Sequence, residues 1–244
     1  MQIESILLCA TDISTYFGPN CMTNATGFFF QREHKLFLVS SRHVFFDQES
    51  KHAPDRVVIK FHTDKNNATC TIDYSIPLYV DGKSQWISGS DRAGDIDVAV
   101  IQIFKEQLPK EVVFEAFGPQ NLLAQTGTVE IGTQLLIVGF PLGFHDTLHH
   151  LPVVRSAINA SSFALRFQGN GYFLTDARTH RGSSGAPVVC RDNAVGPLAW
   201  RLLGIHSGRL DMVGREVELD ESLGLNCAWF ADILLTLTEK KNSE

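Results

Sequence analysis

Short apolar segments separated by turn residues are the main pattern along this chain. They are rich in Val, Ile, Phe and Leu and are bounded by Gly, Asn, Asp or charged pairs, which is typical of β-strands. In the first half the pattern predicts strands at 25–31, 35–40, 56–62, 69–72 and 97–104, and in the second half at 134–139, 152–160, 172–176, 186–190, 198–206 and 223–227. Many short strands at near-regular spacing indicate a β-sandwich or a β-barrel.

A more polar segment, 105–125, interrupts the series of strands near the middle of the chain. It contains two prolines and one glycine. We expect this segment to cross between two structural units, because turn-forming residues and polarity argue against a buried strand.

The last segment has a different hydrophobic period. Its apolar residues recur at helical spacing and predict a terminal helix of about ten residues packed on a β-rich body. These residues are Trp229, Phe230, Ile233, Leu234 and Leu237. Lys240 and Lys241 follow, and cations near a helix C-terminus fit the helix dipole. The alternative, a helix lying on a membrane surface, would carry Lys and Arg along its polar face, which this segment lacks.

The composition narrows the class of protein. With 244 residues, 44% of them hydrophobic and 20% charged, the chain has the balance of a soluble globular protein. Its formal net charge of −6 argues against nucleic acid as the main partner, because phosphate binding relies on clustered Lys and Arg. The 17 phenylalanines favour β structure, since aromatic residues suit a pleated, half-buried surface.

The cysteines and apolar runs bear on the compartment. Five cysteines, an odd number without a C-x-x-C pair, indicate neither a disulfide framework nor a zinc spacing. The apolar run at 6–10 is too short for a signal-peptide core, and no apolar stretch reaches the roughly 18 residues of a membrane span. We therefore expect a cytoplasmic protein without a membrane partner.

Three separated segments carry the residue types that nucleophilic catalysis needs. His43 directly follows an apolar strand, Asp97 lies at the start of another, and Ser184 lies in a loop of small residues. A serine hydroxyl is a weak nucleophile near neutral pH, so it needs an imidazole to take its proton and a carboxylate to hold the imidazole. The turn from Gly182 to Ser184 adds donors, because glycine adopts dihedral angles closed to other residues and can aim both N–H groups at one oxyanion.

Two neighbouring residues compete for these roles. Asp95 would point the same way as Asp97 in an extended strand, and only the Val-Ala-Val run after Asp97 separates them. Ser183 adjoins Ser184, but the Gly-x-Ser-Gly frame selects Ser184. A hydrolase elbow of the Gly-x-Ser-x-Gly type is excluded, because Ala186 stands at the last position and the His precedes the Ser.

Six segments resemble motifs of one protein family and occur in its order. They are Ala25-Thr26-Gly27-Phe28, Leu38-Val39-Ser40-Ser41-Arg42-His43-Val44, Asp97-Val98-Ala99-Val100, Val138-Gly139-Phe140-Pro141-Leu142-Gly143, Thr175-Asp176-Ala177 and Gly182-Ser183-Ser184-Gly185-Ala186-Pro187. They look like the family's Gly-Thr-Gly-Phe strand, its strand ending in the catalytic His, its Asp-hydrophobic-Ala-hydrophobic motif, its Gly-Tyr-Pro-Leu-Gly loop, and its Thr-Asp-Ala and Gly-Asn-Ser-Gly-Gly-Pro motifs. On these motifs the sequence resembles the trypsin-like (chymotrypsin-fold) serine proteases, in the bacterial branch related to the high-temperature-requirement proteases.

The resemblance implies an all-β fold of two antiparallel six-stranded β-barrels, with the active site in the cleft between them and a C-terminal helix. The first barrel would span residues 1–118 and carry His43 and Asp97. The second would span 119–244 and carry Ser184 and the helix. Together the two barrels would form one peptidase unit.

The resemblance also implies a role for each site residue. His43 would be the general base, Asp97 the acid that orients it, and Ser184 the nucleophile. The N–H groups of Gly182 and Ser184 would form the oxyanion hole. Ser183 stands where digestive members have the Asp that receives a freed N-terminus, so we expect no activation by N-terminal cleavage.

Thr179 and His206 are candidates for substrate recognition. Thr179 lies five residues before Ser184, and His206 lies in a Gly-Ile-His strand. Glutamyl endopeptidases and picornaviral-type cysteine proteases look similar at both places, where the pair holds a Glu or Gln side chain. A His ring N–H and a Thr hydroxyl can both donate to a carboxylate or amide oxygen. The resemblance therefore implies a preference for Glu or Gln before the scissile bond, although such a strand need not bind anything.

A cluster of His145, Asp146, His149 and His150 follows the Gly143 loop. Imidazole and carboxylate are suitable metal ligands. A polar surface loop is the favoured interpretation, and we expect no metal.

Two functions remain open on the sequence. The favoured one is a serine endopeptidase that acts on protein or peptide substrates through an acyl-enzyme and needs no cofactor. The alternative is a catalytically silent or latent homologue that binds peptides in the same cleft. The oligomeric state stays open, since no sequence feature bears on it.

Overall fold

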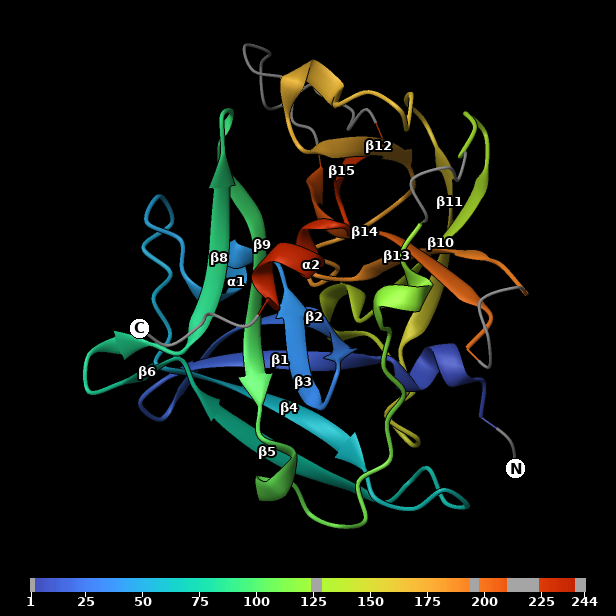
Figure 1. Ribbon diagram of the computed structural model, residues 1–244. Helices are drawn as coiled ribbons and strands as arrows, with labels where there is room; N and C mark the ends of the chain where they lie inside the picture. The colour runs from blue at the N-terminus through green and yellow to red at the C-terminus, as the bar shows by residue number, and fades with distance from the viewer. Residues whose placement is uncertain (1–2, 124–128, 194–197, 210–223, 240–244) are drawn as a thin grey trace.

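Two β-structured units make up the computed structural model, which describes residues 3–123, 129–193, 198–209 and 224–239 (Figure 1). The N-terminal unit is a seven-stranded antiparallel sheet in the order β5 (Thr71–Pro77), β4 (Arg56–His62), β1 (Ala10–Phe17), β2 (Asn20–Arg32), β3 (Lys35–Ser40), β9 (Gly94–Ile103) and β8 (Trp86–Asp91). The C-terminal unit is a closed antiparallel barrel in the order β10 (Gln134–Gly139), β11 (Val153–Asn159), β12 (Tyr172–Asp176), β15 (Leu225–Phe230), β14 (Trp200–Arg209) and β13 (Pro187–Arg191). A short hairpin of β6 (Tyr79–Val80) and β7 (Lys83–Ser84) stands apart from the sheet.

The expected strands are present, and two further long strands join them. Four expected strands match β3, β4, β10 and β12 in full, and the other seven overlap an observed strand with shifted ends. The sequence pattern missed β1 and β8. In β1 the polar residues Thr11 and Thr15 are buried. The sequence of this strand therefore lacks the alternation of apolar and polar residues by which a half-buried strand is recognised. The polar β8 forms because it pairs with β9, since cross-strand pairing can override intrinsic propensity.

The terminal helix is shorter than expected. The helix α2 spans only Ile233–Leu237, and Trp229 and Phe230 belong to β15 instead. These two residues pair with Tyr172 and Gly204 on the neighbouring strands. Strand pairing that closes the barrel therefore determines their structure, although their spacing in the sequence fits a helix. Lys240 and Lys241 lie outside the described residues.

The sheet curls around its own core. Its two edge strands both contribute to one hydrophobic cluster, Ile76 from β5 and Trp86 from β8. The all-β class and the six-stranded C-terminal barrel agree with expectation, whereas the N-terminal unit has seven paired strands instead of six. The seven strands form a sheet whose edge strands are β5 and β8.

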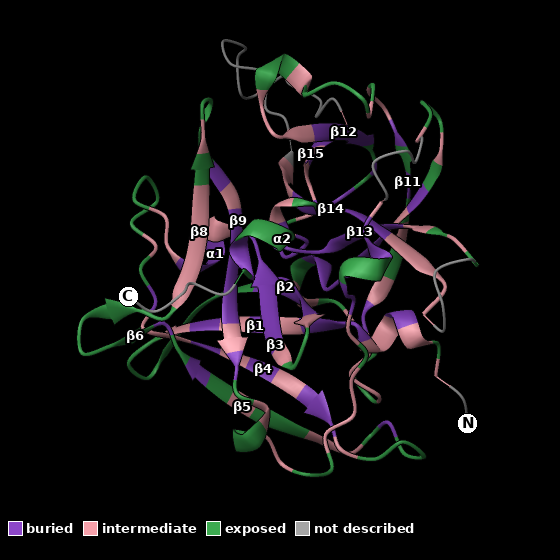
Figure 2. Ribbon diagram, in the orientation of Figure 1, coloured by how far each residue is buried: buried purple, intermediate pink, exposed green. Residues whose placement is uncertain are grey.

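Phenylalanine fills the interior of both units. The eight largest fully buried side chains are all Phe: Phe28, Phe29, Phe30, Phe45, Phe61, Phe117, Phe140 and Phe173. The barrel has its own hydrophobic cluster, which includes Leu135 and Phe173. A third cluster joins the sheet to the barrel and includes Phe28 and Val39 on one side and Val138 and Ile205 on the other. Figure 2 shows this buried zone in purple along β3, β9 and β14, with α2 covering it. The two units therefore share a packed interface.

The segment that follows β9 runs from the sheet to the barrel. Phe117 exchanges backbone hydrogen bonds with β2 through Phe29 and Gln31, and Leu122 bridges to Leu202 of β14. This path agrees with the expected crossing, while the division between 1–118 and 119–244 stays a prediction.

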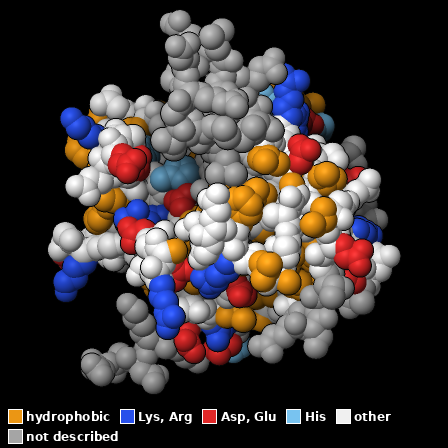
Figure 3. Space-filling model, turned by 90° about the horizontal axis from the view of Figure 1, so that it is seen from above, with side chains coloured by type: hydrophobic (Ala, Val, Ile, Leu, Met, Phe, Trp, Pro, Cys, Tyr) orange, Lys and Arg blue, Asp and Glu red, His pale blue; other side chains and the backbone are white. Residues whose placement is uncertain are grey.

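The surface carries both signs of charge. In Figure 3, Lys and Arg side chains are interspersed with Asp and Glu on the visible face. Within the described ranges, none of the helices has the length and apolar character needed to cross a bilayer.

Candidate active site

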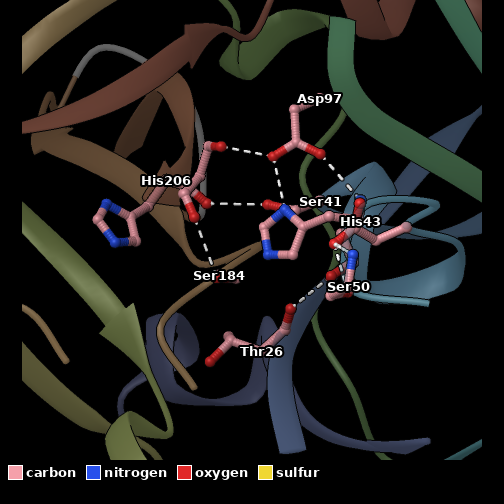
Figure 4. A network of polar contacts seen from close by, with 10 residues as sticks. Thr26, Ser41, His43, Ser50, Asp97, Ser184 and His206 are labelled. Carbon is pink, nitrogen blue, oxygen red and sulfur yellow. Dashed lines mark hydrogen bonds and ion pairs between the residues drawn. The ribbon is translucent and has the colours of Figure 1, made fainter. Parts of the chain in front are cut away.

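His43 and Asp97 are brought together by the pairing of β3 with β9. Ser40, the last residue of β3, lies opposite Ala99 of β9, so the helix α1 (Arg42–Phe45) begins beside the N-terminal part of β9. The Nδ1 atom of His43 lies 2.7 Å from Asp97 Oδ2, and the His43 backbone N–H donates to Asp97 Oδ1 at 2.9 Å (Figure 4). Both carboxylate oxygens therefore hold His43, one through its ring and one through its backbone.

The His43 ring is placed to accept a proton. Burial lowers the pKa of His43, but the hydrogen bond and negative charge of Asp97, with the charge of Asp47, outweigh it and leave the pKa above its ordinary value. When Nδ1–H donates to Asp97, the neutral ring keeps Nε2 as an acceptor. The side chain remains 41% exposed, which leaves this nitrogen accessible.

Asp95, the alternative acid, has a different partner. Its carboxylate pairs with Arg42 Nη2 at 3.2 Å, and its side chain is 65% exposed, against 23% for Asp97. Asp95 lies next to the hairpin that joins β8 to β9. Asp97 is therefore the acid that contacts His43.

Ser207 links the serine to the acid, and the sequence analysis missed it. Its hydroxyl donates to Asp97 Oδ2, and its backbone carbonyl accepts the Ser184 hydroxyl at 3.0 Å. Among the hydrogen bonds of the described residues, none joins the Ser184 hydroxyl to the His43 ring. Ser207 lies at a bulge of β14, and no local pattern distinguishes this serine from others on the surface.

The turn around Ser184 depends on two glycines with positive φ. Gly182 has φ +88° and Gly185 has φ +85°, a region that strains other residues. A Cβ at Gly182 would lie 2.6 Å from the Phe140 carbonyl oxygen, and one at Gly185 would collide with the Thr26 carbonyl oxygen. The turn therefore requires glycine at both positions for conformation and for space.

Two backbone donors on this turn lack a partner in the part of the chain that the structure describes. Neither the Gly182 N–H nor the Ser184 N–H has an acceptor among the described residues. The Arg181 carbonyl accepts the Leu142 N–H at 2.6 Å, and because a trans peptide points its C=O and N–H in opposite directions, the Gly182 N–H points away from Leu142. Ser183, the alternative nucleophile, is buried, whereas Ser184 is partly exposed. The turn can thus offer two hydrogen bonds to an anionic oxygen.

Thr179 and His206 lie on neighbouring parts of the barrel. The Thr179 hydroxyl donates to Asn226 Oδ1 at 2.6 Å. Asn226 is two residues from Ala228, the register partner of His206. Burial, helped by the nearby charge of His43, lowers the pKa of His206 to about 4. No described residue bonds the Nδ1 atom of His206, and no hydrogen bond joins His206 to Thr179.

The histidines after Gly143 are held by local contacts. His149 Nδ1 lies 2.7 Å from Asp146 Oδ2, and His145 Nδ1 lies 2.6 Å from the Gly143 carbonyl oxygen. The His150 ring packs on that of His145 at 4.4 Å between centroids, and burial lowers its pKa to about 4. In the described part of the chain, no group of three or more His, Cys, Asp or Glu side chains is arranged to hold a metal ion.

A closed antiparallel barrel packed on a curled antiparallel sheet, with the His-Asp pair on one and the serine turn on the other, is the chymotrypsin-like architecture. The sequence matches the trypsin-like peptidase domain over residues 25–196, well over half of the chain. The chain therefore belongs to the trypsin-like peptidase family, a family of serine peptidases. A comparison with curated proteins found no match.

Two solved protease structures share this fold. The serine endoprotease from Yersinia pestis has a TM-score of 0.55 at 16% identity, over 94% of this chain and 61% of that one. The active form of the Rv3671c protease from M. tuberculosis has a TM-score of 0.55 at 13% identity, over 98% of this chain and 83% of that one. This chain thus spans less than two thirds of the Yersinia structure, and the likeness is one of fold.

Proposed function

We propose that this protein is a serine endopeptidase that hydrolyses peptide bonds of protein or peptide substrates. In this proposal Ser184 is the nucleophile, His43 the general base and Asp97 the acid that orients the base. The N–H groups of Gly182 and Ser184 bind the oxyanion. The observation that carries the proposal is that Ser207 bonds both the Ser184 hydroxyl and the carboxylate that holds His43, which brings the three proposed catalytic residues to one place.

The proposed reaction begins when the Ser184 hydroxyl turns from the Ser207 carbonyl toward His43, as catalytic hydrogen bonds often form only with substrate bound. His43 Nε2 takes the hydroxyl proton while Ser184 Oγ attacks the substrate carbonyl carbon. The developing oxyanion accepts the two turn N–H groups. His43 then protonates the leaving amine, and a water deprotonated by His43 hydrolyses the acyl-enzyme and restores Ser184. Each step uses groups of this chain and needs no cofactor.

The proposal treats the two halves of the chain as one peptidase unit. Residues 1–118 would supply the base and the acid, and residues 119–244 would supply the nucleophile. Separate core clusters within the sheet and within the barrel support the division, and the third cluster between them supports a single working unit.

The proposed specificity is for Glu or Gln before the scissile bond, recognised by Thr179 and His206. Because burial keeps His206 neutral near pH 7, it offers a hydrogen bond but no positive charge. Thr179 donates its hydrogen to Asn226, so its oxygen remains as an acceptor. An amide matches this pair, since its oxygen accepts from His206 and its NH₂ donates to Thr179, whereas a carboxylate only accepts. Gln is therefore expected to be cleaved faster than Glu.

We also infer a reducing compartment, with the cytoplasm as the expected location. The five cysteines are Cys9, Cys21, Cys70, Cys190 and Cys227, and all are free. Disulfides are common in oxidising compartments and rare in the cytosol. Recovery of the protein with cytoplasmic markers on cell fractionation supports the inference, and recovery outside the cytoplasm contradicts it.

Cleavage of a peptide library, read by mass spectrometry, tests the activity and the specificity together. Wild type should cleave after Gln, and Ser184→Ala should lose activity by on the order of 10⁶-fold. His206→Ala should abolish the preference while leaving residual cleavage. Unchanged cleavage after Gln and Glu in His206→Ala would contradict the specificity alone.

The bond from Ser184 to the Ser207 carbonyl favours one alternative, a silent or latent homologue that binds peptides. In that case folded wild type would cleave nothing in the library yet retain peptides on an affinity column. Cleavage that depends on Ser184 excludes this alternative.

A further inference from the structure

Thr26 contacts the serine turn at two places. It lies on β2 and is completely buried. Its hydroxyl accepts the Phe140 N–H at 2.9 Å and donates to the Gly182 carbonyl at 2.7 Å. Its backbone N–H donates to the Ser184 carbonyl at 3.0 Å. One residue of the N-terminal sheet thus holds two carbonyls of a turn that lies on the C-terminal barrel, and Figure 4 places Thr26 below Ser184.

The segment after β10 holds the same turn from another side. Phe140 precedes the short 3-10 helix η4 (Pro141–Gly143), and the Leu142 N–H donates to the Arg181 carbonyl at 2.6 Å. The Thr26 hydroxyl binds Phe140 and Gly182 simultaneously, so it joins this segment to the turn. Three motifs that are distant in the sequence meet at this hydroxyl.

The residues around the Thr26 hydroxyl leave just enough room for it. A Cβ at Gly139 would lie 2.7 Å from Thr26 Oγ1, so glycine there leaves room for the hydroxyl. The Thr26 carbonyl accepts the Ser40 hydroxyl at 2.8 Å, so the polar groups of Thr26 are all hydrogen-bonded. The side chain therefore has one orientation, with its hydroxyl between Phe140 and Gly182.

Loss of the hydroxyl would act on the backbone of Gly182. The Phe140 N–H and the Gly182 carbonyl would be left buried and unpaired, which is unfavourable. Gly182 has no Cβ and a positive φ, so its peptide groups can rotate to find other partners. The Gly182 carbonyl belongs to the peptide between Gly182 and Ser183, and the peptides on either side of it carry the Gly182 and Ser184 N–H groups. A rotation of the central peptide would therefore shift both of these donors.

We propose that Thr26 is a positioning residue for the oxyanion hole: its hydroxyl fixes the Gly182 backbone so that the N–H groups of Gly182 and Ser184 converge on one oxygen. The kinetic consequence rests on the proposed peptidase function. Thr26 acts through the backbone of the turn, which is why its effect is expected on the transition state more than on substrate binding.

Kinetics of Thr26→Val, Thr26→Ser and Thr11→Val test the proposal. Thr11 is the matched control, because its buried hydroxyl also donates to a carbonyl and accepts an N–H, both of Lys60, within the sheet. We expect Thr26→Val to lower kcat by on the order of 10²-fold, as loss of an oxyanion donor does, with KM within about threefold. Affinity for a peptide aldehyde, whose hemiacetal oxygen occupies the oxyanion position, should fall by a similar factor. Thr26→Ser and Thr11→Val should keep kcat within about threefold of wild type.

Three results would overturn the proposal: an unchanged kcat in Thr26→Val, an equal loss in Thr26→Ser, or an equal loss in Thr11→Val. If Thr26→Val does not fold, Thr26→Cys, which keeps the shape but has a weak donor, is judged by the same criteria.

Failure of the proposed function is distinguishable from failure of this inference. If wild type neither cleaves peptides nor reacts at Ser184, the function fails, and crystal structures of wild type and Thr26→Val decide the inference. A redirected Gly182 carbonyl in the variant supports the role of Thr26, and an unchanged carbonyl overturns it.

Discussion

Asp97 holds His43 at two points, its ring Nδ1 at 2.7 Å and its backbone N–H at 2.9 Å. One carboxylate therefore sets both the tautomer of the ring and the position of the helical turn that carries it. The hydroxyl of Ser207 gives the same carboxylate a third hydrogen bond. Asp97 is the point at which the strands β3, β9 and β14 meet around the proposed base.

Replacing Asp97 should abolish most of the activity. In Asp97→Asn the amide NH₂ can face Nδ1, which favours the tautomer with hydrogen on Nε2 and leaves no acceptor for the serine proton. We expect kcat to fall by on the order of 10⁴-fold. Asp95→Asn is the control, because the exposed Asp95 carboxylate pairs with Arg42, and it should stay within about twofold. An Asp97→Asn enzyme within tenfold of wild type, or an equal loss in Asp95→Asn, would contradict the assignment.

The pH dependence should follow the titration of His43. A general base must be neutral, and Asp97 and Asp47 outweigh burial to raise the pKa of His43 above its ordinary value near 6.5. Therefore kcat/KM should rise with pH and reach half its plateau above pH 6.5. In Asp97→Asn the main raising cause is lost while burial remains, so the NMR titration of the His43 ring should move to lower pH. A midpoint that stays in place would show that Asp97 does not control the ring.

Removing the Ser207 hydroxyl should slow the reaction moderately. In Ser207→Ala the backbone carbonyl that binds Ser184 remains, and only the bond to Asp97 is lost. A hydrogen bond to a charged acceptor contributes about 1.5–3 kcal/mol, so kcat should fall by roughly 10- to 100-fold, with KM unchanged. Ser161→Ala, which removes a hydroxyl bound to the Leu174 N–H, is the control and should keep kcat. Equal effects of the two variants would deny Ser207 a positioning role.

The buried carboxyl of Asp12 should lower the stability of the folded protein as the pH rises. Burial raises its pKa to about 6, although His145 and Lys60 oppose the rise, and no described residue bonds its Oδ1 atom. Because the folded state holds this proton more tightly than the unfolded state, stability is lost as the pH rises from about 4 through about 6. The free energy of unfolding of Asp12→Asn, measured relative to wild type, should therefore increase by on the order of 1–3 kcal/mol when the pH is raised from 4.5 to 7.5. Urea unfolding at both pH values measures this difference.

Asp81→Asn is the control for that experiment, since Asp81 is exposed in the turn between β6 and β7. A pH-dependent gain of equal size in Asp81→Asn would contradict the effect of burial on Asp12. A constant difference for Asp12→Asn would contradict it as well.

Most of the site residues and strands that the sequence predicted were recognised from short local motifs. His43, Asp97 and Ser184 each lie at the end of an apolar strand or in a glycine turn, so a few neighbouring residues mark them. The strands with alternating or continuous apolar residues were predicted for the same reason. In contrast, β8 forms through its pairing with β9, and the expected helix loses Trp229 and Phe230 to the ladder of β15.

Contacts between residues far apart in the sequence left no local pattern, even for Thr26, which lies in one of the six family motifs. The hydroxyl of Ser207 meets an acid 110 positions away, and that of Thr26 meets a carbonyl 156 positions away. The residues next to Ser207 and Thr26 in the sequence do not indicate these partners, which only the fold brings close. Such positioning residues can be found only from the three-dimensional contacts.

Reaction with a fluorophosphonate tests the central claim most directly, because the reagent modifies a serine only when a base activates it. Intact mass and peptide mapping of folded wild type should show one label, on Ser184. The label should be absent in Ser184→Ala and slow to form in Asp97→Asn. An unlabelled folded wild type, or a label that persists in Ser184→Ala, would contradict the claim that Ser184 is a nucleophile activated by His43.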